Sequence, residues 1–234
     1  MESKNNNGLT SIEDVVAIDG PAGAGKSTVA HIVAKELEFQ YLDTGAMYRA
    51  VTWWAIHSNI DLDNPQVVVE YTRKIDLKLT PTDNGLKIEV GGKDISQEIR
   101  TPEITRIIYK LDENPGVREH LVYLQRLFAM KYPTVAEGRD MGTVVFPKAK
   151  CKFYMDALPE VRAKRRQKEL EQRNIFIPIE QLLGEIIERD KRNMEREHSP
   201  LCKADDAILI DTSFLSIEEV SKKIVDISRE RLKK

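Results

Sequence analysis

The chain has 234 residues, of which 41% are hydrophobic and 32% are charged, and its formal net charge is -2. This length suits one sizeable α/β core with an insertion, or two small domains. The near-neutral charge argues against a generally basic nucleic-acid binder, so any affinity for anions must come from local clusters of cations. The two cysteines, Cys151 and Cys202, form no CxxC pair. We therefore expect reduced thiols rather than a disulfide framework or a structural zinc site.

The amino-terminal residues 1–12 lack the apolar segment of a signal peptide. No apolar run approaches the roughly 20 residues that a membrane-spanning helix needs. We expect residues 1–12 to form a flexible tail, and we expect a cytoplasmic protein with no membrane partner.

Five short apolar runs predict the strands of a core sheet. Most of them lack alternation of apolar and polar residues, which is typical of strands buried on both faces of a parallel sheet. Helical patterns lie between the runs, and Ser216 with Glu219 forms a capping-box signature after the last one. The sequence therefore predicts an α/β fold whose core is a five-stranded parallel sheet flanked by helices. The runs are residues 15–18, 39–42, 134–136, 152–155 and 208–210.

Between the second and third runs the chain is too long for one crossover connection. Residues 77–79 and 86–90 alternate apolar and polar side chains around an Asn84-Gly85 turn, which predicts a hairpin in a small antiparallel sheet. Later, two helices beginning near Pro159 and Ile179 carry many arginines, and we predict that they form a short lid. The predicted parts are a tail (1–12), a core (13–62, 134–157 and 197–234), an inserted domain (63–133) and the lid (158–196).

One motif indicates nucleotide chemistry, because it matches the pattern G-x-x-x-x-G-K-[ST] directly after an apolar run and at the start of a helix. In this loop, backbone N–H groups and the helix N-terminus surround phosphates. Lys26 can reach the β- and γ-phosphates of ATP, and Ser27 can ligate Mg²⁺. The alternative is a glycine-rich turn without a ligand. The predicted ATP-binding residues are Gly20, Pro21, Ala22, Gly23, Ala24, Gly25, Lys26, Ser27 and Thr28.

Three further segments read LDTGAMYR from residue 42, EGRDMGTVVFP from residue 137 and RDKR from residue 189. Together with the P-loop, in order and spacing from about Val15 to the carboxyl terminus, they closely resemble the bacterial cytidylate kinase family. The resemblance implies transfer of the γ-phosphate of ATP to CMP and dCMP, which gives CDP or dCDP and ADP in pyrimidine nucleotide metabolism. It also implies that the insert binds the nucleoside monophosphate and that the lid moves. We expect a monomer, since such a kinase must open and close.

The resemblance also assigns roles to the acceptor-binding residues. Arg49 and Arg139, each expected just past a strand end, would hold the acceptor phosphate, since guanidinium forks bind phosphate bidentately. Asp140 would accept from the cytosine amino group, as carboxylates do when they read cytosine. Thr44, Arg118 and Arg196 would complete the base site. The alternatives are a surface ion pair for each arginine and a helix cap or ion-pair partner for Asp140.

In the lid, Arg162 is expected to bind ATP, and Arg166 and Arg189 are expected to act in catalysis with Lys26 and Arg139. Arg189 and Asn193 would also contact the acceptor. The family has an acidic, ribose-contacting residue where this chain has Asn193, and a small hydroxyl residue where it has Tyr109. These departures put the preference between CMP and dCMP in question.

Two rival functions remain open at this point. One is another kinase on the same scaffold, acting on adenylate, uridylate or shikimate, because fold alone does not specify the substrate. The other is a nucleotide-binding regulator without catalysis. We expect no further aspartate to ligate the metal, so we expect Ser27, phosphate oxygens and water to hold Mg²⁺.

Overall fold

The computed structural model of the chain describes residues 11–82, 85–172 and 174–232. In this part of the chain, parallel strands form a central sheet in the order β2-β6-β1-β7-β8. Their bounds are β1 (Val16–Asp19), β2 (Gln40–Asp43), β6 (Thr134–Gly138), β7 (Cys151–Asp156) and β8 (Ile208–Asp211). Each predicted core strand overlaps one of these, so the predicted five-stranded parallel sheet is confirmed.

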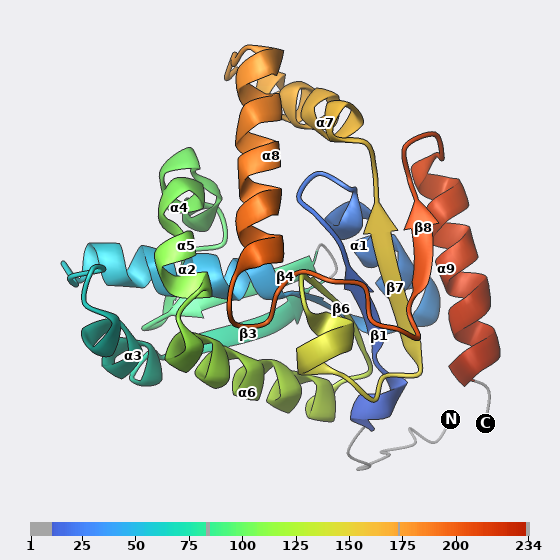
Figure 1. Cartoon of the computed structure of the whole chain (residues 1–234). Helices are drawn as coiled ribbons and strands as arrows, with labels where there is room; N and C mark the ends of the chain where they lie inside the picture. The colour runs from blue at the N-terminus through green and yellow to red at the C-terminus, as the bar shows by residue number, and fades with distance from the viewer. Residues whose placement is uncertain (1–10, 83–84, 173, 233–234) are drawn as a thin grey trace.

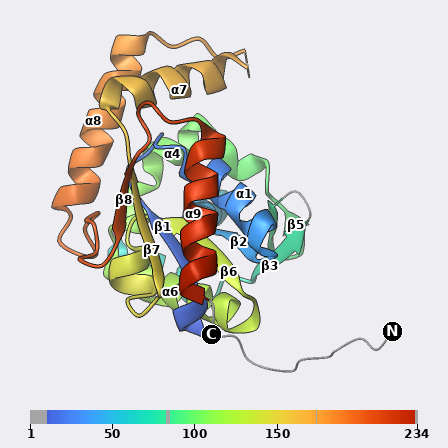
Figure 2. The same cartoon turned by 90° about the vertical axis from the view of Figure 1, so that its right-hand side faces the viewer.

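The central sheet is buried on both faces, as the unbroken apolar runs predicted. In and beside β1, Val15 and Ala17 pack into one hydrophobic cluster, whereas Val16 and Ile18 pack into the other. The helices α1 (Lys26–Leu37) and α9 (Ile217–Leu232) cover the second cluster, and α2 (Thr44–His57) and α6 (Pro115–Lys131) cover the first. Figures 1 and 2 show α1 and α9 together on one side of the sheet.

Side chains just before the helices set where they begin. The Asp43 carboxylate accepts from the Ala46 N–H at 2.8 Å, which satisfies a free donor in the first turn of α2. Before α9, the Glu219 N–H donates to Ser216 Oγ at 3.1 Å and the Ser216 N–H donates to Glu219 Oε2 at 2.8 Å. This reciprocal pair confirms the predicted capping box.

The insertion lies beside α2. Its strands form an antiparallel sheet in the order β3-β4-β5, and Ile88 and Val90 of this sheet pack against Ala50 and Trp53 of α2. The predicted Asn84 turn position lies outside the described residues. The elements between α2 and α6 are α3 (Pro65–Arg73), β3 (Leu77–Thr82), β4 (Gly85–Val90), β5 (Lys93–Asp94), η2 (Glu98–Arg100), α4 (Pro102–Ile107) and α5 (Tyr109–Asp112).

Two helices, α7 (Pro159–Glu171) and α8 (Ile179–Glu195), form an arm between β7 and β8. They pack on each other through Leu170, Leu182 and Ile186, a cluster separate from the main core. At the top of Figure 1, α8 runs down toward the end of α5. Among the described residues, no helix is long and apolar enough to cross a membrane.

Two short elements complete the chain. A 3₁₀ turn, η1 (Ile12–Asp14), begins after Ser11, whose hydroxyl accepts from the Glu13 N–H at 3.2 Å. Residues 1–10 of the predicted tail lie outside the described residues. A single turn of π-helix, η3 (Met141–Val145), follows β6, and π-turns are frequent at functional sites.

Candidate active site

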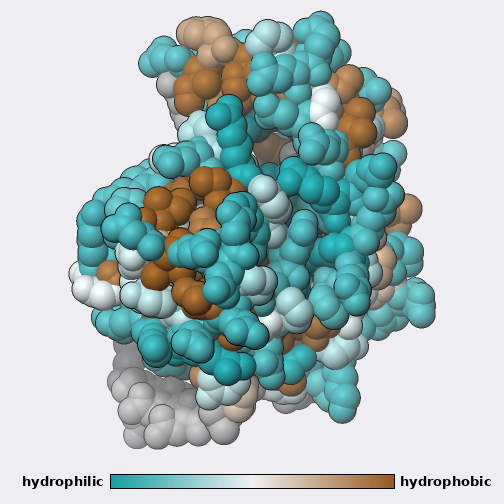
Figure 3. Space-filling model, turned by 60° about the vertical axis from the view of Figure 1, so that its left-hand side comes forward, coloured by the Kyte–Doolittle hydropathy of each residue, from teal (hydrophilic) through white to brown (hydrophobic). Residues whose placement is uncertain are grey.

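A cavity of about 900 Å³ lies where the carboxyl ends of β1, β2 and β6 meet the insert and the lid helices. Ligands of open α/β sheets bind at this edge, because the loops after the parallel strands converge there. The face drawn in Figure 3 is mostly hydrophilic and is hollowed below its upper lobe. The cavity is therefore large enough for more than one polar ligand.

The P-loop forms one wall of the cavity. Lys26 is buried at the start of α1, and its Nζ donates to the Pro21 carbonyl oxygen at 2.8 Å. Burial, assisted by the nearby Arg139 guanidinium, lowers the pKa of Lys26 to about 7. The nearby Glu137 and Asp19 carboxylates offset this shift only in part, so a bound anion would stabilise the charged ammonium group further.

Next to the P-loop, Ser27 Oγ donates to Glu137 Oε1, and the Tyr41 hydroxyl donates to the same oxygen at 3.2 Å. Thr44 Oγ1 donates to the backbone oxygen of Glu137 at 2.7 Å, which fixes the end of β6 against the start of α2. Hydroxyl and carboxylate oxygens are the ligand types that Mg²⁺ prefers. The adjacent Ser27 and Glu137 oxygens therefore fit a magnesium ion accompanying a nucleotide.

Arg49 and Arg139 enter the cavity from different elements. Arg49 lies in the second turn of α2 rather than directly after a strand, and its Nη2 lies 2.8 Å from Asp43 Oδ2. Arg139 directly follows β6, as predicted, and its Nη1 donates only to the Gly138 carbonyl oxygen, at 3.3 Å. Among the described residues, no carboxylate pairs with Arg139, so its positive charge is available to a ligand.

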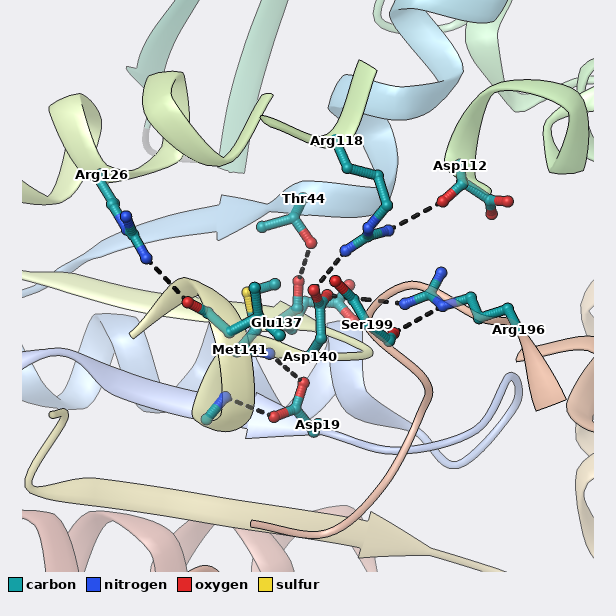
Figure 4. Close-up of polar contacts among 12 residues, drawn as sticks. Asp19, Thr44, Asp112, Arg118, Arg126, Glu137, Asp140, Met141, Arg196 and Ser199 are labelled. Carbon is teal, nitrogen blue, oxygen red and sulfur yellow. Dashed lines mark hydrogen bonds and ion pairs between the residues drawn. The ribbon is translucent and has the colours of Figure 1, made fainter. Parts of the chain in front are cut away.

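At the other end of the cavity, Arg118 Nη2 donates to Asp140 Oδ2, and the two side chains are only 5% and 4% exposed. Arg196 Nη2 lies 4.0 Å from Asp140 Oδ1, and its Nε donates to the Ser199 carbonyl oxygen at 2.6 Å (Figure 4). Three of the four predicted base-site residues, Arg118, Asp140 and Arg196, thus lie together. The Asp140 side chain makes no cap hydrogen bond to η3, so of the two alternatives the ion-pair partner is the one observed in the free protein.

Asp140 is supported by the turn that follows it. Asp19, the last residue of β1, accepts from the Met141 and Gly142 N–H groups, both at 2.7 Å. Arg126 of α6 donates to the Val144 and Val145 carbonyl oxygens, both at 2.9 Å. Burial raises the pKa of Asp19 from its ordinary 3.8 to about 7, and the two backbone donors oppose that shift. Both ends of η3 are therefore held, and with them the backbone that carries Asp140.

The lid arginines differ in what they contact. Arg189 lines the cavity without a partner among the described residues, and its burial together with Arg139 lowers its pKa to about 10. Arg166 also lines the cavity and pairs with Glu169 at 2.8 Å. Arg162 instead lies behind the P-loop: it pairs with Asp190 and donates to the Ala22 carbonyl oxygen at 3.0 Å.

Most of the predicted site residues face the cavity. Gly20 and Pro21 of the P-loop do not line it, and neither does Arg162, which lies behind the loop. The predicted residues that line it are Ala22, Gly23, Ala24, Gly25, Lys26, Ser27, Thr28, Thr44, Arg49, Arg118, Arg139, Asp140, Arg166, Arg189, Asn193 and Arg196.

Comparison with known proteins agrees with this arrangement. The family model described as cytidylate kinase matches residues 16–230 of the chain. The chain belongs to the cytidylate kinase family. It is accordingly a kinase, which is a phosphotransferase, and the resemblance inferred from its motifs is confirmed.

Individual relatives in the cytidylate kinase family cover almost the whole chain. A cytidylate kinase of Carboxydothermus hydrogenoformans is 47% identical over 91% of this chain and 96% of its own length. One of Bacillus cereus (strain G9842) is 45% identical over 91% of this chain and 94% of its own. A bifunctional pantoate ligase/cytidylate kinase of a Synechococcus strain is 46% identical over 94% of this chain, which spans 41% of that longer protein.

Three acidic residues of this cytidylate kinase site were missed in the sequence. Glu137 ends a buried apolar strand beside the P-loop strand, and that position was the available signal. Asp19 ends the P-loop strand itself, and its position directly after the four apolar residues 15–18 was the available signal. Asp112 ends a four-residue helix, and no pattern in the sequence distinguishes it from the neighbouring Glu113.

Proposed function

We propose that the P-loop binds ATP with Mg²⁺ and that the opposite end of the cavity binds CMP, or dCMP, as the phosphate acceptor. The observation that supports this proposal most is that one cavity contains all of these groups. Lys26 lies at one end and the Asp140–Arg118 pair at the other, and the same cavity is lined by arginines without a carboxylate partner among the described residues. A P-loop alone is common to many nucleotide enzymes. A buried carboxylate with adjacent guanidinium groups at the far end adds a reader for a cytosine ring, which offers an amino donor and two acceptors.

The acceptor and donor phosphates would meet between these ends. Arg139 and Arg189 have no carboxylate partner among the described residues, so both can donate bidentately to phosphate oxygens. Phosphoryl transfer is accelerated mainly by positioning and by cations that neutralise the developing charge. With Lys26 and Arg49, the cavity presents cations around the path of transfer, and no strong general base is required of the chain.

Mg²⁺, when bound with ATP, would neutralise part of the charge on the phosphate oxygens. Ser27 and Glu137 are the residues of this chain that would hold it, directly or through water. Arg162 would act differently from the other arginines, since its hydrogen bond to Ala22 supports the P-loop from behind. Arg166 would reach bound phosphates from the lid after leaving Glu169.

Turnover with separate acceptors tests this proposal. ADP formation from ATP and Mg²⁺ should be strong with CMP, measurable with dCMP, weaker with UMP and near background with AMP or shikimate. Uracil presents an acceptor where cytosine presents its amino group, and it would therefore oppose the Asp140 carboxylate. Equal rates with CMP and UMP would contradict the role given to Asp140, and no turnover with any acceptor would contradict the kinase.

A further inference from the structure

The turn that follows Asp140 is capped by a carboxylate from a distant strand. Asp19, the last residue of β1, is only 4% exposed, and its oxygens accept from the Met141 and Gly142 N–H groups, both at 2.7 Å. These are the first two N–H groups of η3, and such groups have no acceptor within their own helical turn. Asp19 therefore acts as the cap of η3, although it precedes Met141 by 122 residues in the chain.

Asp140 occupies the position from which a helix is ordinarily capped. It directly precedes η3, and aspartate is among the preferred residues there, because its carboxylate can accept from N–H groups of the first turn. The Asp140 side chain nevertheless makes no cap hydrogen bond. It accepts from Arg118 instead, and Figure 4 shows Arg118 on one side of the turn and Asp19 on the other. One aspartate thus caps the turn, and the other faces the cavity.

The backbone of Asp19 is held rigidly by the core. Strand β1 is the middle strand of the sheet, and Asp19 pairs with Gly138 of β6 on one side and with Tyr154 of β7 on the other. The next residue, Gly20, leaves no room for movement toward β7, because an added Cβ would lie 1.9 Å from the Met155 carbonyl oxygen. Groups on rigid strands position their neighbours more accurately than groups on loops.

The capping carboxylate is costly to keep where it is. Burial raises the pKa of Asp19, the nearby charge of Asp140 adds to the effect, and the two N–H donors oppose it. Among the described residues, those two N–H groups are the only hydrogen-bond partners of the Asp19 side chain. Without Asp19, two buried donors would lack an acceptor, which is unfavourable. The Asp140 carboxylate, next to them in the chain, can then turn to accept from them and leave Arg118.

We propose that Asp19 is a positioning residue for acceptor selection: by capping η3 in place of Asp140, it keeps the Asp140 carboxylate directed toward Arg118 and the base of the acceptor. Asp19 does not line the cavity, so it acts through Asp140 and not on the ligand. The inference rests on the proposed function, because the direction of Asp140 affects selectivity only if Asp140 reads a nucleotide base.

The test compares kcat/KM for CMP and for UMP in the parent protein and in Asp19→Ala. The variant should lose about tenfold in kcat/KM for CMP, mainly through KM, because a hydrogen bond to a charged group is worth about that factor. The kcat/KM for UMP should change little, since uracil presents no amino group to the carboxylate. The preference for CMP over UMP should therefore fall about tenfold, whereas the KM for ATP should change much less.

Two further variants make this result specific. Asp19→Asn keeps the shape of the side chain and one accepting oxygen, so it should retain part of the preference for CMP. Asp156→Asn is the matched control. Asp156 ends the neighbouring strand β7 and also accepts from a backbone N–H group, that of Ala157 at 2.8 Å, but it is exposed and does not line the cavity. The control should leave the preference unchanged.

A double substitution shows whether Asp19 acts through Asp140. In Asp140→Asn the carboxylate that reads the base is already absent. Adding Asp19→Ala to this variant should change the preference between CMP and UMP much less than Asp19→Ala does alone. In a crystal structure of the single variant Asp19→Ala, the Asp140 carboxylate should accept from N–H groups of η3 and no longer from Arg118.

Several outcomes would overturn the inference. An equal loss with CMP and UMP in Asp19→Ala would assign Asp19 a structural role only, and an unchanged preference would remove its role in selection; both leave the kinase function in place. Additive effects of Asp19→Ala and Asp140→Asn would also contradict it. If Asp19→Ala does not fold, Asp19→Asn permits the same comparisons. No turnover of CMP by the parent protein would contradict the proposed function, and the inference with it.

Discussion

At the scale of single residues, the site consists of charges that are poorly compensated in the free protein. Lys26 and Arg189 are held in the cavity with lowered pKa values, for which burial is the largest cause. Asp140 pairs with Arg118 and lies 4.0 Å from Arg196, so this carboxylate is shared between two guanidinium groups. Buried charges of this kind cost stability unless a partner is present. Phosphates and a cytosine ring would supply the missing partners.

The lowered pKa of Lys26 predicts proton uptake when ATP binds. The unliganded folded protein has a pKa of about 7 at Lys26, below the ordinary 10.5 of the unfolded chain. Between these values the unfolded chain binds the proton more tightly, so the contribution of Lys26 to stability rises with pH in that window. Near pH 8, Lys26 of the unliganded protein is mostly deprotonated. The phosphates of bound ATP should raise its pKa again, so ATP binding should take up about one proton.

Calorimetric titration with Mg²⁺ and ATP in buffers of different ionisation enthalpy would measure this uptake. Lys26→Arg is the matched control, because arginine keeps the charge and stays protonated throughout. The arginine variant should show much less uptake. Equal uptake by both proteins would assign the proton to another group.

The buried Asp140–Arg118 pair predicts a linked loss of stability and acceptor recognition. Asp140→Ala leaves the Arg118 guanidinium buried without its carboxylate, which should cost about 3 kcal/mol of unfolding free energy. Denaturant unfolding would measure this cost, and steady-state kinetics should show a large loss with CMP and a small change in the KM for ATP. Replacing both residues by neutral ones should cost less than the sum of the single changes. A stable Asp140→Ala protein would contradict the pairing.

At the scale of elements, the site depends on short segments between strands and helices. The π-turn η3 is held by Asp19 from β1 and by Arg126 from α6, so two core elements fix the backbone beside Asp140. The lid helices, in contrast, pack through their own small cluster. Segments with few core contacts have low local stability, which suits a part that must move. We therefore expect the groups on the core to be held more rigidly than those on the lid.

Two helical glycines predict opposite effects of the same substitution. Gly184 in α8 has open space where a Cβ would lie, so Gly184→Ala should stabilise the protein by about 0.5–1 kcal/mol through helix propensity. Gly116 in α6 is the matched control, because its Cβ would lie 2.6 Å from Val69 Cγ2. Gly116→Ala should therefore lower Tm, whereas Gly184→Ala should raise it with kcat unchanged. A fall in Tm for Gly184→Ala would contradict the described geometry of α8.

At the scale of the whole molecule, the core, the insert and the lid contribute charges to one cavity. Arg139 follows a core strand, Arg49 lies on a core helix, and Arg189 lies on the lid. Arg139 and Arg49 both lower the pKa of Arg189, which is the sign expected for like charges brought close together. We expect their repulsion to oppose closure of the lid until an anion lies between them. Ligand binding, lid position and stability are therefore linked.

This linkage predicts that Arg189→Met raises the stability of the free protein and weakens its stabilisation by ligands. The pKa of Arg189 is lowered to about 10. At lower pH the arginine is charged in both the folded and the unfolded chain, so the folded protein carries the full free-energy cost of burying that charge. The variant should have a higher Tm without ligand. ATP with CMP should stabilise the parent protein by about 2.7 kcal/mol at 100 times Kd, and the variant much less at the same concentrations.

Thermal unfolding with and without both nucleotides would test this pair of effects. Lys191→Met is the control, since Lys191 is an exposed cation on the same helix and does not line the cavity. It should change neither the unliganded Tm nor the ligand response. A lower unliganded Tm for Arg189→Met would show that the arginine stabilises the free fold.

The sequence by itself determined the local elements and the phosphate chemistry. Buried parallel strands leave unbroken apolar runs, caps leave a Ser or Asp before a helix, and a P-loop needs glycines followed by Lys26 and Ser27, all of which are short-range patterns. The tertiary structure alone decided which distant groups meet: Glu137 with Ser27, and Asp19 and Arg126 with the π-turn. The physical reason is that burial and pairing of a charge depend on neighbours far along the chain, which no local pattern encodes. Arg162 is a further example: it lies behind the P-loop because of a contact with the distant Ala22, although in the sequence it stands among other arginines of the same helix.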